Sequence, residues 1–262
     1  MKFVRGGLQM TTIRDCIAPD RNPKVPSIKL PEGSIDTHVH IFESQYPLFE
    51  GRGYNPPDST LDDLKHLHSQ LGVSRVVYTQ PSPYGVDNSA ILKGMKVMND
   101  ETPGRARGVC AIKMDVSDDF LEDLDKQGIK GVRLNMDNIG GMPIGLDEIP
   151  TLEARIKDLG WHVEYLFPGK DIVELAPIFK KSSVPISIAH FAYQPATNGI
   201  NSEGFKTLLD LVRDGNTWIK ISGANRVSKT DLPPYNDVMP MARALIEACL
   251  LYTSDAADDV EC

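Results

Sequence analysis

Two histidines stand two residues apart in the stretch "GSIDTHVHIF", at the end of a short apolar run. His38 and His40 would lie on the same face of a β-strand, because side chains in a strand alternate between its two faces. Two neighbouring imidazoles can bind a zinc ion or donate hydrogen bonds to a substrate carbonyl. An imidazole can also be a hydrogen-bonded group of the core. The motif alone therefore leaves a functional and a structural interpretation equally open.

A third histidine and two arginines occupy comparable positions further along the chain. His190 ends the apolar run "VPISIAH", Arg133 lies in "IKGVRLN", and Arg226 follows "TWIKISG". A guanidinium group presents a planar fork that matches a carboxylate, although either arginine could instead be an ordinary ion-pair partner. Three histidines and two arginines at the ends of separate strands favour a site that binds an anionic substrate.

Other polar residues have less specific positions. Ser82 follows the second predicted strand, and Tyr54 lies in the long loop after the first, as a lid residue or as loop packing. His162 lies at the N-terminal end of its strand. In a barrel that end contributes to stability rather than to catalysis, so we interpret His162 as structural. His66 and His68 lie two apart on a predicted helix, where they cannot share a face, and we expect both at the surface.

Apolar runs at regular spacing along the chain predict the strands that would position these residues. Seven short runs rich in Val, Ile or aromatic residues are predicted strands, at 34–41, 74–80, 106–112, 129–135, 161–167, 184–190 and 217–223. Predicted helices lie between them, at 60–71, 88–99, 117–127, 147–159, 171–181 and 202–214. Consecutive βαβ units of this kind form a doubly wound sheet or a barrel. The first strand is followed by "HVHIFES" rather than by a Gly-rich turn, which favours a (β/α) barrel with polar residues converging on one mouth.

Bulk composition narrows the class of partner. The chain has 262 residues, 41% of them hydrophobic, and a formal net charge of -8. An acidic chain without a basic cluster argues against nucleic acid or an anionic membrane as the main partner. The four cysteines form no CxxC pair, and we expect neither a secretory signal nor a membrane helix, so a reducing cytoplasm is the simplest location. The oligomeric state is not indicated.

Six motifs in order resemble the amidohydrolase superfamily: "IDTHVHIF", "QPSPYGVDN", "GIKGVRLN", "GWHVEYLF", "VPISIAHFA" and "WIKISGANR". The similarity runs from about Gly33 to about Ala248, and it points to the branch of pyrone-dicarboxylate lactonases, sulfomuconolactone hydrolases and galactarolactone isomerases. This resemblance implies an α/β fold, a (β/α)8 TIM barrel, acting on a small carboxylated lactone. It also implies that His38, His40 and His190 are catalytic and polarise the scissile carbonyl. Arg133 and Arg226 would then bind carboxylates.

The resemblance further implies that Ser82 and Tyr54 line the substrate pocket. In the lactonase branch no cofactor is expected. In other branches the histidine pair holds zinc, and His38, His40 and His190 would then be ligands of a zinc-dependent hydrolase or decarboxylase. An isomerase of a sugar-acid lactone is a further alternative. A non-catalytic carboxylate-binding barrel would need only the two arginines.

Two positions depart from the pyrone lactonase pattern. Leu166 stands where that pattern has a tyrosine, and the neighbouring Tyr165 would point to the other face of the strand. The segment "NMDNIGG" also lacks a second arginine. A sugar-acid lactone or a muconolactone-like compound therefore fits no worse than the pyrone dicarboxylate.

In this superfamily an aspartate that ends strand eight, in a "WGTDWPH"-like motif, activates water. The C-terminal segment "ARALIEACLLYTSDAADDVEC" lacks that motif and any later helix. One interpretation makes "LLYTSD" a short eighth strand with Asp255 as the base. The one we favour makes 249–262 a foreign tail. The domains would then be an irregular arm over 1–32, an incomplete barrel of seven βα units over 33–248, and that tail. We expect such a chain to be poorly soluble and inactive by itself.

Overall fold

The computed structural model describes residues 13–136 and 143–258, with side chains as far as Cys249. The first twelve residues of the expected arm and the last four of the expected tail lie outside this range. No helix in the described ranges is long and apolar enough to cross a membrane.

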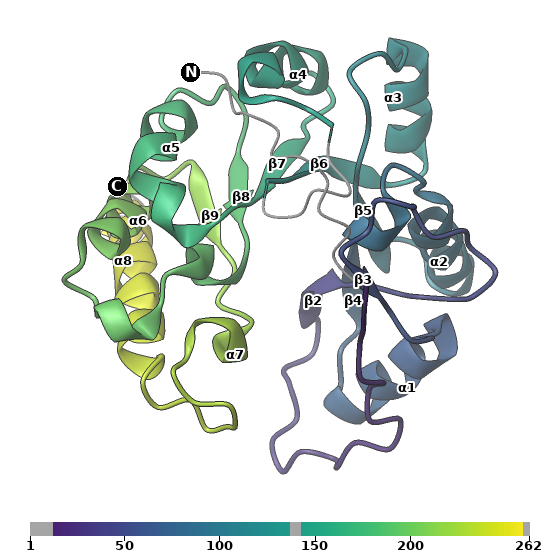
Figure 1. The fold of residues 1–262 in the computed structure, drawn as a ribbon, viewed down its shortest axis with the longest axis horizontal. Coiled ribbons are helices and arrows are strands. Elements are labelled where there is room, and N and C mark those ends of the chain that lie inside the picture. The colour runs from purple at the N-terminus through teal and green to yellow at the C-terminus, as the bar shows by residue number, and fades with distance from the viewer. Residues whose placement is uncertain (1–12, 137–142, 259–262) are drawn as a thin grey trace.

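A seven-stranded sheet forms the centre of the molecule, and all of its pairings are parallel. Its order follows the chain: β2 (Ile35–Val39), β4 (Arg75–Thr79), β5 (Ala106–Cys110), β6 (Ile129–Asn135), β7 (His162–Leu166), β8 (Ile186–Ile188) and β9 (Thr217–Ile219). The sheet curves from β2 and β4 through β6 and β7 to β9, and the helices lie on its outer side (Figure 1). All seven predicted strands are present, which confirms an incomplete TIM-type barrel of βα units.

Helices connect successive strands where the sequence predicts them: α1 (Leu61–Leu71), α2 (Ser89–Glu101), α3 (Asp118–Lys126), α4 (Ile149–Ile156), α5 (Ile172–Phe179) and α6 (Glu203–Arg213). Thr60 caps α1 in a reciprocal capping box with Asp63, and Ser117 caps α3 through the backbone N–H of Phe120. Such caps satisfy the free N–H groups of the first turn, so they fix where each helix begins.

Two helices follow the last strand: α7 (Ala224–Val227) and α8 (Met239–Asp258). In the described part of the chain no strand follows β9, and the backbone over 249–258 continues α8. The interpretation in which Asp255 follows an eighth strand is therefore wrong. Strands β2 and β9 are the two ends of the sheet, and no pairing joins them in the described residues.

The expected irregular arm contains one short element. Strand β1 (Arg14–Asp15) pairs in parallel with β3 (Tyr54–Asn55), in the loop that carries Tyr54. The arm also meets the first helix, because Arg21 donates hydrogen bonds to the Asp63 carboxylate. The described part of the arm is therefore irregular apart from one two-residue strand, which pairs with the loop that carries Tyr54.

The outer face of the sheet packs against the helices in one apolar core. Tyr165 on β7 is fully buried, with its ring centroid 4.7 Å from that of Phe179 on α5. Tyr165 therefore faces the helices, as its position beside Leu166 predicts. Its neighbour Glu164 points the other way, because side chains alternate along a strand.

Candidate active site

The strand register brings polar side chains together inside the curved sheet. Arg133 on β6 is the direct neighbour of Glu164 on β7. Residues paired in this way share one face of a sheet. Both side chains are almost completely buried, with exposed fractions of 4% for Arg133 and 0% for Glu164. Two opposite charges therefore lie in the interior, next to the position where β2 ends.

The three predicted histidines form one cluster. The ring centroid of His38 lies 4.9 Å from that of His40 and 4.9 Å from that of His190. The Nε2 atoms of His38 and His40 are 3.3 Å apart. His190 enters from the far side of the barrel and pairs its Nδ1 with the Ser222 hydroxyl at 2.9 Å. The structure thus brings together the histidine pair of the first predicted strand and the histidine that ends the sixth.

Lys220, directly after β9, completes this cluster from the other end of the sheet. Its ammonium group contacts three acceptors: the Thr37 carbonyl oxygen at 3.0 Å, Nδ1 of His38 at 3.0 Å, and the Glu164 carboxylate. An ammonium group has three N–H donors and no acceptor. His38 must therefore accept at Nδ1, and its ring proton resides on Nε2.

The neighbouring ring has the opposite tautomer. Nδ1 of His40 lies 2.8 Å from the carbonyl oxygen of Thr79, which can only accept. His40 therefore carries its proton on Nδ1 and a lone pair on Nε2. The Nε2–H of His38 then donates to that lone pair. A directed chain of hydrogen bonds runs from Lys220 through both rings to the backbone of β4.

All three histidines are held in the neutral form. Burial, together with the cations nearby, lowers the pKa of His38 far below its ordinary value. Burial lowers the pKa of His40 to about 3, and burial with the charge of Arg226 lowers that of His190 to about 4. At neutral pH the cluster therefore presents uncharged imidazoles.

Glu164 is the anion at the centre of the site. Burial by itself would raise its pKa, but the charges of Lys220 and Arg133 outweigh burial and hold the pKa below the ordinary value. One carboxylate oxygen accepts from Lys220. The other lies 3.6 Å from Nε of Arg133 and 3.6 Å from Nδ1 of His38. That oxygen has no hydrogen-bond partner among the described residues.

Arg133 and Arg226 reach the site from different depths. Nη1 of Arg133 donates to the Gln80 carbonyl oxygen at 2.8 Å, deep in the barrel. Arg226 on α7 is exposed and donates to the Tyr193 hydroxyl at 3.1 Å. Two guanidinium groups and one ammonium group face one carboxylate here, so the cluster has an excess of positive charge. Such a site attracts an anion.

Tyr54 and Ser82 lie side by side, and their place in a substrate pocket stays a prediction. Their hydroxyl groups are hydrogen bonded, and the charges of both Arg133 and Arg226 act on the Tyr54 phenol. Burial is nevertheless the largest effect and raises the pKa of Tyr54. The small sheet formed by β1 and β3 includes Tyr54, which pairs with Arg14.

A left-handed turn carries His190. The four residues His190–Tyr193 all have φ between 49° and 54°, although none is glycine. Each residue with a side chain in this region costs about 1–2 kcal/mol. The backbone of Gly169 packs closely against the turn, because a Cβ added at Gly169 would come within 2.1 Å of the Tyr193 carbonyl oxygen. The strain sets the direction of His190 and of Tyr193, the partner of Arg226.

Sequence reasoning missed Lys220 and left Glu164 without a role. Both could have been found from strand alternation, because Lys220 lies two residues after Trp218, which is the register neighbour of Ser187 and so of Glu164. The prediction for His68 was wrong. Its side chain is 1% exposed, and its Nε2 lies 3.3 Å from the Asp36 carboxylate, whereas His66 is exposed as predicted.

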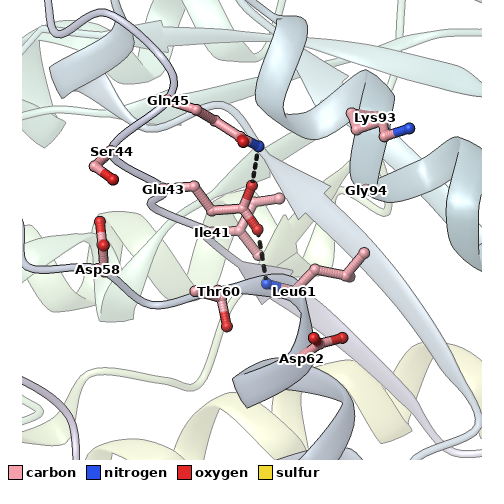
Figure 2. A pocket seen from close by; sticks show the side chains of 10 residues that line it. All are labelled: Ile41, Glu43, Ser44, Gln45, Asp58, Thr60, Leu61, Asp62, Lys93 and Gly94. Carbon is pink, nitrogen blue, oxygen red and sulfur yellow. Dashed lines mark hydrogen bonds between the residues drawn. The ribbon is translucent and has the colours of Figure 1, made fainter.

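A separate cavity of about 460 Å³ lies beside the start of α1 (Figure 2). Its lining includes three carboxylates, of Glu43, Asp58 and Asp62, and one ammonium group, of Lys93. Glu43 accepts a hydrogen bond from the backbone N–H of Leu61 at 3.1 Å. Three carboxylates repel an anion, so this cavity does not suit the substrate class that the arginines suit.

The site combines a histidine pair at the end of β2, a third histidine after β8 and an arginine inside β6. All of these residues lie within the range that a family model matches. The amidohydrolase family model matches residues 35–256. The chain belongs to the amidohydrolase family. The match includes the strand that ends at the histidine pair and every later strand of the sheet, so family membership rests on the barrel and the site together.

Individual members of the family give the same result. The chain is 34% identical over 236 residues to a 2-pyrone-4,6-dicarboxylate hydrolase of Comamonas testosteroni, covering 86% of this chain and 76% of that protein. It is 32% identical to a 4-sulfomuconolactone hydrolase of Hydrogenophaga intermedia, covering 88% and 76%. A crystal structure of a probable 2-pyrone-4,6-dicarboxylic acid hydrolase of Acinetobacter baumannii with citric acid bound matches with a TM-score of 0.70 at 28% identity, covering 81% and 78%.

Proposed function

We propose that a complete barrel with this site hydrolyses the ester bond of a small carboxylated lactone without a metal ion. The observation that carries this proposal is the contact of three neutral imidazoles with a surplus of cationic side chains. The Nε2–H of His38 can donate to a substrate carbonyl that takes the place of His40 as its acceptor, and the arginines offer charge to carboxylates. The names of the related hydrolases support the same substrate class.

The reaction adds water to the lactone carbonyl and breaks the ring C–O bond. The oxygen of the carbonyl gains negative charge as water attacks. The Nε2–H of His38, which donates to His40 in the free protein, would turn to that oxygen and stabilise its charge together with nearby guanidinium groups. The carbon ends as a carboxylate, the ring oxygen keeps one proton as a hydroxyl, and one proton is released. Arg133 and Arg226 would hold the substrate carboxylates on two sides of the ring.

Zinc is the alternative cofactor, and the donor set fits it poorly. Two nitrogens bound to one tetrahedral ion at about 2.1 Å would lie about 3.4 Å apart, which is close to the spacing of the two Nε2 atoms. A ligand nitrogen must offer a lone pair, however, and Nε2 of His38 carries the ring proton because Lys220 donates to Nδ1. No step of the proposed reaction therefore uses a metal.

Binding and product analysis test the proposal. We expect a dicarboxylated lactone to bind saturably, and its uncharged dimethyl ester to bind at least about tenfold more weakly, because each charge-assisted hydrogen bond contributes about 1.5–3 kcal/mol. Proton NMR would show a ring-opened hydroxy acid if hydrolysis follows. Equal binding of acid and ester would contradict the proposal, and a product that retains its ring would identify an isomerase instead.

A further inference from the structure

We propose that Lys220 is a positioning residue that keeps the histidine pair from binding zinc. This inference deepens the proposed function, because it names the side chain that makes the site metal-free. The spacing of His38 and His40 would otherwise suit a zinc ion, as shown above. The proton on Nε2 of His38 decides whether the pair binds zinc or stays metal-free, and Lys220 determines where that proton resides.

Every N–H group of Lys220 has an acceptor. Its three N–H groups are matched by three acceptors on two strands: the Thr37 carbonyl oxygen and the His38 ring on β2, and the Glu164 carboxylate on β7. The side chain is 12% exposed and contacts a carboxylate that is fully buried. Three acceptors surround the ammonium group, so it donates in all three directions.

Removing the ammonium group would reverse the tautomer of His38. The free oxygen of Glu164 already lies 3.6 Å from Nδ1 of His38. Without Lys220, Nδ1 would carry the proton and donate to this carboxylate, and Nε2 would offer a lone pair beside that of His40. A carboxylate behind a histidine is the usual support of a histidine that binds zinc. His190 stands at ring-contact distance from His38 as a third ligand.

Lys220→Met is therefore the decisive variant, because methionine keeps the length of the side chain and removes every donor. Lys206→Met on the exposed side of α6 is the matched control. Long-range proton–nitrogen NMR of the histidine rings identifies the tautomers, and calorimetric titration with zinc sulfate measures the zinc affinity. Neither measurement requires a lactone, so a failed substrate assay would leave both results standing.

In the unaltered protein and in Lys206→Met, we expect a lone-pair nitrogen at Nδ1 of His38 and at Nε2 of His40. We expect Lys220→Met to show the proton on Nδ1 of His38 and to bind one zinc ion about 10- to 100-fold more tightly than the control, which is the influence that supporting groups have on metal affinity. Adding His38→Asn or Glu164→Gln to Lys220→Met should abolish most of that gain.

Two results would overturn the inference. One is an Nδ1–H tautomer of His38 in the unaltered protein, which would show that Lys220 does not determine it. The other is zinc affinity that is the same in Lys220→Met and Lys206→Met. If Lys220→Met does not fold, Lys220→Gln takes its place, and the tautomer measured in the unaltered protein decides the question by itself.

Discussion

At the scale of single residues, the two arginines differ because their surroundings differ. Arg133 is buried and already faces Glu164, so it contributes to folding as well as to the charge of the site. Arg226 is exposed on α7 and contacts Tyr193 through a hydrogen bond and a cation–π contact, with 6.0 Å between its guanidinium carbon and the ring centroid. Arg226 can therefore be changed with little effect on the interior.

Arg226→Met should weaken binding of a dicarboxylated lactone about tenfold or more, because it removes one charge-assisted contact. The midpoint of urea unfolding should stay nearly the same. Calorimetric titration gives the affinity, and Arg213→Met, at an exposed arginine of α6 paired with Asp210, is the control. Equal affinities of the two variants would remove Arg226 from the substrate site.

Glu164 has the largest expected effect on stability of any single residue in the site. Glu164→Gln leaves the buried charges of Lys220 and Arg133 without a counter-charge, and we expect the free energy of unfolding to fall by about 3–5 kcal/mol. Glu122→Gln on the solvent side of α3 should change it by less than about 0.5 kcal/mol. Urea unfolding measures both. Similar values for the two variants would show that Glu164 is not the counter-charge of the cluster.

At the scale of elements, the sheet register and one strained turn position the site. The turn His190–Tyr193 has no tolerance for movement, because the Gly169 backbone packs directly against it. A residue far from the chemistry thus controls the direction of a predicted catalytic histidine.

Gly169→Ala should lower the free energy of unfolding by about 2–3 kcal/mol, because the added carbon overlaps backbone that cannot give way. Gly104→Ala is the comparison, since nothing lies within 4 Å of an added carbon there and only its φ of +78° opposes alanine. We expect about 1 kcal/mol for that variant. A smaller loss for Gly169→Ala than for Gly104→Ala would show that the turn is free to shift.

The elements could be predicted and the turn could not. Each strand is a short apolar run with clear boundaries, and Thr60 and Ser117 fix two helix starts, so the order and the outward side of each strand follow from local pattern. The segment "HFAY" contains no glycine or asparagine, the usual residues of left-handed backbone, so nothing in it signals that conformation. Its geometry is imposed by packing.

The contacts between distant segments also could not be predicted from the local sequence pattern. His68 is buried because Asp36, on another element, reaches it. Lys220 contacts His38 across 182 positions of sequence, and only the curvature of the whole sheet brings them together. The three histidines were found because each ends a recognisable strand.

At the scale of the whole molecule, the site is a set of partly buried neutral histidines supported by one buried anion, Glu164. The pKa of His40 at about 3 and that of His190 at about 4 lie below the ordinary histidine value of 6.5. Between these values the unfolded chain binds more protons than the folded chain, so acid favours unfolding. Glu164 acts in the same direction, because its pKa is also lowered and its contribution is lost in acid.

The free energy of unfolding should therefore be highest above about pH 6.5 and should fall as the pH is lowered toward 4. Each buried histidine contributes up to about 1.4 kcal/mol per pH unit in this window. Urea unfolding at several pH values measures the slope. His40→Asn should flatten it, whereas His66→Asn, at an exposed position of α1, should not. A slope that does not respond to His40→Asn would contradict the burial of a neutral imidazole there.

The central claim is that carboxylate recognition and carbonyl polarisation operate here without a metal. The most direct test is a titration of the chelator-treated protein with a dicarboxylated lactone, followed through the ring signals of His38, His40 and His190. We expect saturable binding that perturbs these rings, and any ring opening that follows, before zinc is added. Binding that appears only after zinc is supplied would contradict the account.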